Sequence, residues 1–538
     1  MKYIKSICYS ILLILLSGLS VKSQHQVIQG TITNDIFLTA DKTYLLRGFV
    51  YVKDGATFHI EPGTIVYGEK QSKGTLIITK SGKIKAEGTV ERPIIFTSNQ
   101  APGNRDFGDW GGVMILGSAP TNCLAVECAV EGGVNNAAGD GLFGGTNPAD
   151  SSGVFRYCRI EFAGIPFQPD NEINGLTMAG VGNKTIIDHV QVSFCGDDPF
   201  EWFGGTVNCS HLVSYIGWDD DFDTDFGYTG KVQFAFGLRA KNIADVSLSN
   251  GFESDNSKYG DGFQPFTSCV FSNVTLVGPL ENPFDFYNPN HYAGMQLTRN
   301  TKLSAYNSIV MGFPIGLLID GESCETNASN GDIGFKNNIV AGNLEQLKII
   351  TYAGPATLNI NTWFMNNNNT LYPQNSDVGL VAPFNLNNPN PMPSSSSPAL
   401  SGADFSASDL NHPYFSTVNY RGAFGTENWM QGWTNFDPQN TTYFPVSNKM
   451  EPQITSLEIF PNPTNGQLNL KFENNSSGSL TIKLHDLLGK EVFAENIKIE
   501  SKVSVLRNYD FTYLEKGIYL FSVQHAKGST LSQKIIIK

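Results

Sequence analysis

A short strand-like phrase closed by glycine recurs along this chain, and this recurrence limits the possible folds more than any other feature. Residues 158–164 read CRIEFAG, residues 190–196 read VQVSFCG and residues 212–217 read LVSYIG. Apolar and polar residues alternate in each phrase, as they do in a β-strand that ends in a turn. The sequence therefore predicts the same strand several times over.

A second set of phrases places asparagine before the apolar run. It comprises SNVTLVG, YNSIVMG and NNIVAG, at residues 272–278, 306–312 and 337–342. Strands that recur at roughly 20 to 35 residues without helical periodicity are typical of a parallel β-solenoid, whose coils bury their apolar faces by stacking. Asparagine and glycine both tolerate the left-handed backbone of tight coil corners. A β-sandwich or a β-propeller is the alternative, although no propeller period is visible.

Composition agrees with an all-β chain. Only 16% of the 538 residues are charged, against about 25% in an average domain, so long solvated helices and coiled coils are excluded. The formal net charge of −14 argues against nucleic acid as a partner, because its phosphates are bound by basic residues.

The phrases EPGTI at 61–65 and IKAEGTVERPIIFTS at 84–98, followed by the glycine-closed strands, resemble the right-handed parallel β-helix of pectin-lyase-like proteins. The resemblance extends from residue 27 to residue 440. It implies a β-helix domain over residues 24–445. A domain boundary near the proline-rich residues 387–398 is the alternative to a loop on the helix.

The first 23 residues have the pattern of a secretory signal peptide. Lys2 and Lys5 precede an apolar run, and small and polar residues follow it. No later segment holds eighteen apolar residues in a row, so we expect no transmembrane segment.

Export places the cysteines in an oxidising compartment. Cys123 and Cys128 lie in a loop rich in small residues and are the best candidates for a disulfide. Cys158, Cys195 and Cys209 lie in apolar runs, where we interpret them as small buried hydrophobic residues.

The C-terminal residues 456–538 differ from the rest in charge and pattern. Ten Lys and Arg against eight Asp and Glu give them a net charge of +2, and with the +3 of the signal peptide set aside, the middle of the chain carries −19. We interpret residues 446–455 as a linker. Alternating segments and turns after it predict about seven short strands in a small immunoglobulin-like β-sandwich.

This tail resembles the type A C-terminal sorting domain of the type IX secretion system. The matches are PNP at 461–463, D-x-x-G-K-x-V at 486–492, L-x-x-G-I-Y at 514–519 and the final KIIIK. The sorting-signal positions that follow are Pro461, Asn462, Pro463, Gly489, Lys490, Gly517 and Tyr519. The resemblance implies export by that machinery, removal of the tail by a sortase-like protease, and attachment to surface lipopolysaccharide or release outside the outer membrane.

Negative charge concentrates just after two closing glycines, in GDDPFEWFGG at 196–205 and WDDDFDTDFGYTG at 218–230. Residues two apart share a face of an extended segment. The second segment is therefore predicted to line one side with Asp219, Asp221, Asp223 and Asp225. Crowded carboxylates repel unless they are neutralised, and Ca²⁺ takes six to eight oxygen ligands. Calcium binding is thus the first interpretation, and turn capping or a catalytic role are the alternatives.

Stacked coils would extend this acidic face. Glu253, Asp255 and Asp261 are expected on it if the coils stack as proposed.

A catalytic role would fall to Asp197, Asp198, Glu201 and Asp220. The resemblance implies glycoside hydrolases with paired carboxylates or calcium-assisted lyases as the enzyme classes. The G-D-D of polygalacturonases is present at 196–198, but its G-H-G and R-I-K companions are missing.

Other side chains near the acidic segments have two interpretations each. Trp202, Trp218 and Tyr228 can stack on sugar rings or pack inside the solenoid. His189 and His211 are interpreted as core or edge residues rather than bases. Arg239 and Lys241 are weak candidates for holding a uronate.

The sequence therefore predicts a secreted, surface-attached β-helix protein that binds calcium and acts, without catalysis, in glycan binding or adhesion. The alternative class is a calcium-assisted polysaccharide lyase or a glycoside hydrolase.

Overall fold

The computed structural model describes residues 25–168, 171–445, 454–474, 478–487, 489–499, 503–525 and 530–538. The predicted signal peptide and most of the predicted linker lie outside the described residues. The chain divides into two compact units, residues 1–446 and 447–538. The proline-rich residues 387–398 therefore belong to the first unit. No helix among the described residues is long and apolar enough to cross a membrane.

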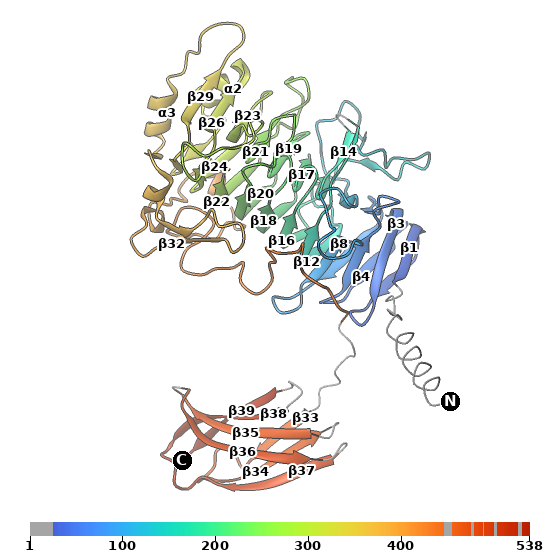
Figure 1. Cartoon of the computed structure of the whole chain (residues 1–538), viewed down its shortest axis with the longest axis vertical. Coiled ribbons are helices and arrows are strands. Elements are labelled where there is room, and N and C mark those ends of the chain that lie inside the picture. Colours follow the sequence, from blue (N-terminus) through green and yellow to red (C-terminus); the bar gives the residue numbers. More distant parts are fainter. Residues whose placement is uncertain are drawn as a thin grey trace, which may run out of the picture. The chain divides into compact units, whose positions relative to one another are not determined.

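The first unit is a parallel β-helix, in which successive coils place their strands on three faces (Figure 1). The first face is formed by β2 (Ile36–Leu38), β4 (Thr57–Ile60), β7 (Lys83–Glu87), the first halves of β12 (Gly153–Glu161), β16 (Ile186–Ser193), β18 (Asn208–Tyr215), β20 (Lys231–Leu238) and β22 (Val270–Val277), then β24 (Ser304–Tyr306) and β27 (Phe335–Lys336).

The second face begins with the first halves of β1 (Gln26–Ile32) and β3 (Thr43–Val52). It continues through β5 (Ile65–Gly68), β8 (Ile94–Ser98), the second halves of the five long strands, β25 (Ile309–Met311), β28 (Ile339–Ala341) and β30 (Thr370–Tyr372).

The third face begins with the second halves of β1 and β3. It continues through β6 (Thr75–Ile78), β9 (Gly112–Leu116), β15 (Leu176–Ala179), β17 (Phe200–Phe203), β19 (Phe222–Asp225), β21 (Phe252–Ser254), β23 (Ala293–Leu297), β26 (Ile315–Asp320) and β29 (Glu345–Ile350).

One residue with a left-handed backbone turns each long strand from the first face to the second. In the later coils this residue is Asn273, Asn307 or Asn337, with φ between 55° and 59°. Asparagine accepts this conformation more readily than most residues. The prediction that asparagines form the coil corners is confirmed.

Earlier coils fill the same corner with rings instead. Tyr157, His189, His211 and Phe234 have φ between 48° and 62°, and the strand register skips each of them. The histidines therefore lie at a coil corner, partly exposed, which agrees with their interpretation as edge residues.

The interior of the β-helix is a continuous stack of apolar side chains. Phe200 packs on Phe222 with ring centroids 5.5 Å apart, and Trp202 packs on Tyr228 at 5.4 Å. All four side chains are fully buried. Because burying one such side chain contributes about 1.5 to 3 kcal/mol, this stack holds neighbouring coils in register.

Two helices, α2 (Glu322–Asn330) and α3 (Ile360–Asn366), pack buried apolar residues against the interior stack. The remaining elements lie outside the three faces and are β10 (Cys128–Ala129), β11 (Leu142–Phe143), β13 (Ile165–Gln168), β14 (Asn171–Ile173), η1 (Asn375–Val378), β31 (Leu380–Ala382), β32 (Asn390–Pro393), η2 (Pro398–Leu400) and η3 (Ser408–Leu410). Val130, Val134 and Phe143 pack on the outer side of the third face, and Phe424 and Trp433 pack on the second. Cys123 and Cys128 are joined by a disulfide in the segment over the third face.

The second unit is a small antiparallel β-sandwich. One sheet contains β33 (Ile454–Phe460), β34 (Gln467–Asn474) and β37 (Val503–Asp510), and the other contains β36 (Glu491–Ile499), β35 (Gly478–Asp486), β38 (Gly517–His525) and β39 (Thr530–Ile537). The predicted number of strands and the sandwich are confirmed.

The sorting-signal residues occupy two turns of this sandwich, at residues 461–463 and 489–490, and the beginning of β38, at Gly517 and Tyr519. Asn462 donates to the carbonyl of Lys534 at 2.7 Å and accepts from the backbone N–H of Ile536 at 3.0 Å. The backbone N–H of Lys490 donates to Asp486 at 2.9 Å. The PNP turn is thereby tied to the last strand of the chain.

Candidate functional site

The turns from the second face to the third carry the acidic residues. Asp197 and Asp198 lie in the turn before β17, and Asp219 lies in the turn before β19. On the third face itself, Glu201 pairs in register with Asp223. Their strand neighbours point into the core, so alternation directs both carboxylates to the outer side of the coil.

Coil stacking brings five of these residues together in what we call the carboxylate cluster, which consists of Asp197, Asp198, Glu201, Asp219 and Asp223. One oxygen from each of Asp197, Asp198 and Asp219 lies within 4.8 Å of the others, and the same holds for Asp198, Glu201 and Asp223. Asp198 belongs to both groups. Within the described part of the chain, none of the five forms an ion pair with lysine or arginine.

The carboxylate cluster is covered by the segments over the third face. Asp198 is only 9% exposed and Glu201 only 6%. Glu201 accepts a hydrogen bond from Asn174, whose amide also donates to Glu131 at 3.3 Å. One oxygen of Asp219 and one of Asp223 are buried without a hydrogen-bond partner.

This environment disfavours the ionised carboxylates. Burial raises the pKa of Asp219 to about 6. Burial, with the negative charge of Glu253, raises the pKa of Asp223 well above its usual range, and burial with the charge of Asp220 does the same for Asp198. Buried like charges at this spacing are stable only when they are protonated or when a cation neutralises them.

Neighbouring coils extend the acidic face, as expected for two of three residues. Glu253 pairs in register with Asp223, and burial raises the pKa of Asp255 to about 7. Asp255 also forms an ion pair with Arg299. Asp261 instead accepts the backbone N–H of Phe263 at 3.2 Å within its own loop.

The predicted set of Asp219, Asp221, Asp223 and Asp225 on one side is wrong in one member. Asp221 turns inward, where its Oδ1 lies 3.3 Å from Nη1 of Arg239. Asp221 lies in the turn before β19, and strand alternation does not apply there. Arg239 is itself fully buried in this ion pair, so it is unable to hold a uronate.

Asp220 and Asp225 lie beside the carboxylate cluster. The backbone N–H of Asp220 donates to Asp198 at 2.7 Å, and its carboxylate accepts from the backbone N–H of Asn250. Asp220 is 2% exposed, which leaves it no access to a substrate. Burial raises the pKa of Asp225 to about 7.

For two of the three aromatic residues, Trp202 and Tyr228, the structure supports packing inside the solenoid rather than stacking on sugar rings. Trp202 and Tyr228 are fully buried in the core stack, because they occupy inward positions of the coil. Trp218 is 38% exposed and lies in the turn next to Asp219. Its indole N–H donates to the carbonyl of Ala244 at 3.2 Å.

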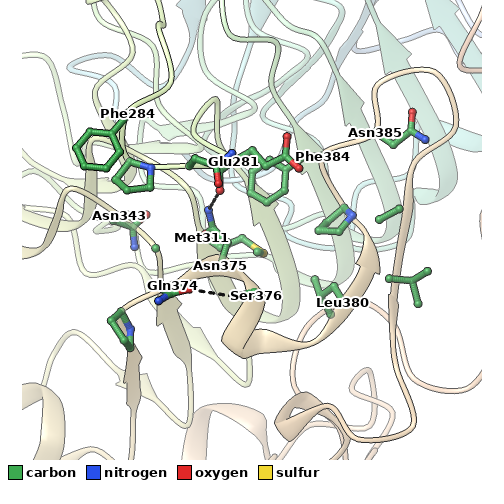
Figure 2. Close-up of a pocket in the computed structure, with 17 residues that line it drawn as sticks. Glu281, Phe284, Met311, Asn343, Gln374, Asn375, Ser376, Leu380, Phe384 and Asn385 are labelled. Atoms are coloured by element: carbon green, nitrogen blue, oxygen red, sulfur yellow. Dashed lines mark hydrogen bonds between the residues drawn. The ribbon is translucent and has the colours of Figure 1, made fainter.

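A large cavity opens farther along the same series of turns (Figure 2). Its volume is about 750 Å³, and its lining combines the amides of Asn343, Gln374 and Asn385 with the rings of Phe284 and Phe384. No motif in the sequence predicts this cavity. The only available signal was the run ENPFDFYNP at 281–289, which exposes aromatic residues in a turn.

An ion pair links a turn near the carboxylate cluster to a turn that lines the cavity. Lys241 forms an ion pair with Asp285 at 2.8 Å, which fastens the turn after β20 to the turn that contains Phe284. The carboxylate cluster and the cavity therefore belong to one row of turns along the β-helix.

Comparison with known proteins agrees with this architecture. The family model described as "Pectate-lyase like beta helix domain" matches residues 30–380, and the model described as "Secretion system C-terminal sorting domain" matches residues 458–538. No curated protein matches the chain.

Two solved structures are similar at low identity. The enzymatically active domain of tailspike protein 2 from bacteriophage CBA120 is 10% identical with a TM-score of 0.22, over 95% of this chain and 72% of that one. The corresponding domain of tailspike protein 4 is 11% identical with a TM-score of 0.22, over 95% of this chain and 61% of that one. Similarity at these TM-scores carries no argument about ligand or activity.

Proposed function

This chain belongs to the pectate-lyase-like β-helix family, and from that premise we propose that it is a calcium-dependent glycan-binding protein displayed outside the cell. Its sorting domain marks it as a secreted, cell-surface or extracellular protein of the type IX secretion system. The calcium, the glycan and the absence of catalysis are the parts that we propose.

The observation that carries the proposal is the carboxylate cluster. Two groups of three carboxylate oxygens share Asp198, and each group fits within 4.8 Å. Ca²⁺ takes oxygen ligands at about 2.3 to 2.6 Å in a flexible shell, so such a group can surround one ion. One buried oxygen of Asp219 and one of Asp223 have no hydrogen-bond partner, and each would gain an interaction by coordinating the ion.

Calcium would also relieve the electrostatic cost of the site. The pKa values of these carboxyl groups are raised by burial and by each other's charge, and within the described residues no lysine or arginine pairs with them. A divalent cation replaces that repulsion with attraction in a region of low dielectric constant.

The glycan is assigned to the cavity of Figure 2. Amide side chains both donate and accept hydrogen bonds, and exposed aromatic rings stack on the apolar faces of sugars. Phe284 is 95% exposed at the rim. A cavity of about 750 Å³ is the size of ordinary small-ligand sites.

Binding fits the geometry better than the glycoside hydrolase alternative, and the turnover assay below separates it from the calcium-assisted lyase alternative. Glycosidases place two carboxyl groups about 5 to 9.5 Å apart around an accessible bond. Asp198, Glu201 and Asp220 are each less than a tenth exposed, so they offer no accessible pair of this kind. These carboxylates are arranged to hold an ion.

A glycan array with the full chain tests the binding function, with and without Ca²⁺. Each glycan that binds is then incubated with the protein and assayed for new reducing ends and for unsaturated products. We expect binding and no turnover. Turnover that Asp198→Asn abolishes would establish the enzyme alternative instead.

Removal of the tail and attachment to lipopolysaccharide are separate proposals that rest on the sorting domain. Residues 456–538 are fused to a periplasmic reporter in a strain that carries the secretion system. The reporter should reach the cell surface or the medium, with the tail removed and lipopolysaccharide attached. A reporter that stays in the periplasm contradicts this part of the account.

A further inference from the structure

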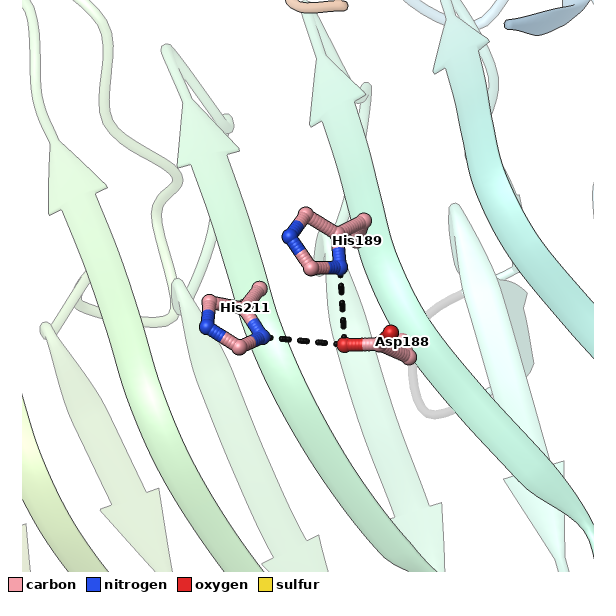
Figure 3. Close-up of side chains that lie close together, drawn as sticks. All are labelled: Asp188, His189 and His211. Carbon is pink, nitrogen blue, oxygen red and sulfur yellow. Dashed lines mark hydrogen bonds and ion pairs between the residues drawn. The ribbon is translucent and has the colours of Figure 1, made fainter. Parts of the chain in front are cut away.

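A second polar cluster lies at the corner between the first and second faces, on a different edge of the β-helix from the carboxylate cluster (Figure 3). It consists of Asp188, His189 and His211. Nδ1 of His189 and Nδ1 of His211 each lie 2.9 Å from the same oxygen, Oδ1 of Asp188. Two imidazoles from adjacent coils therefore converge on one carboxylate.

Coil stacking produces this convergence. Asp188 on β16 pairs in register with Ser210 on β18, so the next residues, His189 and His211, occupy the same corner position one coil apart. Their ring centroids are 4.1 Å apart. The coil between the two histidines is 22 residues long, and this length places them at the same corner of adjacent coils.

Ring stacking alone does not explain the histidines. The stack continues to Tyr157, 4.3 Å from His189, and to Phe234, 5.1 Å from His211. Those rings occupy the same corner without a ring nitrogen, so the position accepts any flat side chain. Only the two middle rings carry nitrogen, and in each of them Nδ1 lies 2.9 Å from Oδ1 of Asp188.

The polar atoms at this corner are prepared for a ligand. Ser210 donates to Oδ1 of Asp188 at 2.7 Å, which fixes the orientation of the carboxylate. Nδ1 of His189 is buried and makes no hydrogen bond in spite of its closeness to Asp188, because the angle is unfavourable. A buried ring nitrogen without a hydrogen-bond partner has a lone pair with which it can bind a metal ion.

The protonation states suit a metal ion as well. Burial alone would raise the pKa of Asp188, but the two imidazoles hold it well below its usual range, so the carboxylate is ionised. Burial lowers the pKa of His189, which keeps this imidazole neutral and able to donate a lone pair.

The surroundings provide both shelter and access. The indoles of Trp429 and Trp433 stand edge-on to the imidazoles, at 5.1 Å from His211 and 5.6 Å from His189. A cavity of about 260 Å³ opens beside His211 and is also lined by Glu427. This cavity gives solvent access to His211.

We propose that Asp188, His189 and His211 bind a transition-metal ion of the Zn²⁺ or Co²⁺ type through one carboxylate oxygen and two Nδ1 atoms. Two imidazoles and a carboxylate select such ions, whereas the all-oxygen carboxylate cluster selects Ca²⁺. Binding requires the proton of each neutral imidazole to be on Nε2, which leaves the Nδ1 lone pairs free, and it replaces the contacts to Asp188 with bonds to the metal. The chain thus has two metal sites with different selectivity.

Cobalt titration of the full chain tests the proposal. Excess Ca²⁺ is kept in solution so that the carboxylate cluster is not available, and bound Co²⁺ is followed by its visible absorption and by elemental analysis. We expect one Co²⁺ per chain. His189→Phe and His211→Phe keep the ring stack, as Phe234 does in the next coil, and should each weaken Co²⁺ binding more than tenfold.

A matched control comes from a second histidine and aspartate pair. Nε2 of His59 lies 3.5 Å from Asp35, but no second histidine joins that pair among the described groups. His59→Phe should leave Co²⁺ binding unchanged.

A measurement on the unaltered chain keeps the test valid even if a variant misfolds. Electron paramagnetic resonance of one equivalent of Cu²⁺ should show coupling to two imidazole nitrogens. No Co²⁺ uptake in excess Ca²⁺, equal uptake by the Phe variants, or a Cu²⁺ spectrum without nitrogen coupling would overturn the proposal, and the three groups would then only pack against one another without binding a metal.

Discussion

Oδ1 of Asp221 lies 3.3 Å from Nη1 of Arg239, and both side chains are fully buried. Ser214 donates to the same oxygen at 2.6 Å, and Arg239 also donates to the carbonyl of Asn250 at 2.8 Å. The pair fastens the turn before β19 to the next coil. It therefore positions Asp219 and Asp223, which flank Asp221, for the carboxylate cluster.

Removing one partner of this pair should destabilise the β-helix strongly. Arg239→Met leaves Asp221 as an uncompensated buried charge, which typically costs about 3 to 5 kcal/mol. Lys241→Met is the control, because its ion pair with Asp285 is partly exposed and is worth about 1 kcal/mol or less. Urea midpoints compare the two variants with the parent chain, and equal shifts would contradict the structural role of the buried pair.

Stability of the metal-free chain should fall as pH rises. An acid whose pKa is raised on folding holds its proton in the native state after the unfolded chain has lost it, so the native state is favoured at lower pH. The ordinary aspartate pKa is 3.8, and burial raises that of Asp219 to about 6 and those of Asp225 and Asp255 to about 7.

The melting temperature in EDTA should therefore decline between about pH 4 and about pH 7, the window set by these shifts. Saturating Ca²⁺ should flatten the decline, since the ion stabilises the ionised carboxylates. A melting temperature in EDTA that rises across this window would contradict the electrostatic account of the carboxylate cluster.

Glycan binding and stability should depend on different aromatic residues. Phe284→Ala removes an exposed ring at the cavity rim and should lower affinity for any glycan found on the array by about tenfold, as loss of one aromatic contact of roughly 1.4 kcal/mol does. Trp202→Phe should lower the melting temperature and leave the affinity unchanged. If Trp202→Phe lowered the glycan affinity and Phe284→Ala did not, the assignment of the glycan to the cavity would be wrong.

The asparagine corners make a separate prediction about the fold. Asn307 has φ of 55°, and its amide exchanges hydrogen bonds with the backbone of Asp404 at 2.9 and 3.2 Å. Asn307→Ala should cost about 2 to 3 kcal/mol, from the lost hydrogen bonds and the strained backbone. Asn307→Gly should cost about 1 kcal/mol less, because glycine adopts this backbone freely. Equal losses would show that the corner is unstrained.

The coils and corners could be predicted from the sequence because their causes are local. Alternation in residues 190–196 and 212–217 specifies strands, and asparagine before the apolar run specifies the left-handed corner. The sorting tail was predictable for a similar reason, since each of its motifs is a short local phrase in a turn or strand of one small sandwich. Both inferences needed only residues that are close in sequence.

The facing of individual side chains could not be predicted so well. Trp202 and Glu201 are adjacent, and alternation says only that they point to opposite sides. The stacked neighbours Met178 and Thr224 pair with Trp202 and decide that it points inward. Asp221 does not follow the strand alternation because it precedes β19, which begins at Phe222.

Sites assembled from distant coils were the hardest to predict. The cavity joins residues near 281 with residues near 375, and the histidine pair joins residues 189 and 211. Their closeness depends on the length of every coil between them. The sequence of one strand and its turn does not specify how many residues the other coils contain, and the strand register between distant coils depends on those lengths.

Thermal unfolding with and without Ca²⁺ tests the central claim most directly. If the carboxylate cluster binds Ca²⁺, EDTA should lower the melting temperature of the full chain, since Ca²⁺ at one hundred times its dissociation constant adds about 2.7 kcal/mol. Asp198→Asn should abolish the difference, because Asp198 belongs to both carboxylate groups. Glu345→Gln, which alters an exposed pair with Lys348, should keep it. A melting temperature that is the same in EDTA and in Ca²⁺ would contradict the claim that this β-helix is a calcium-binding protein.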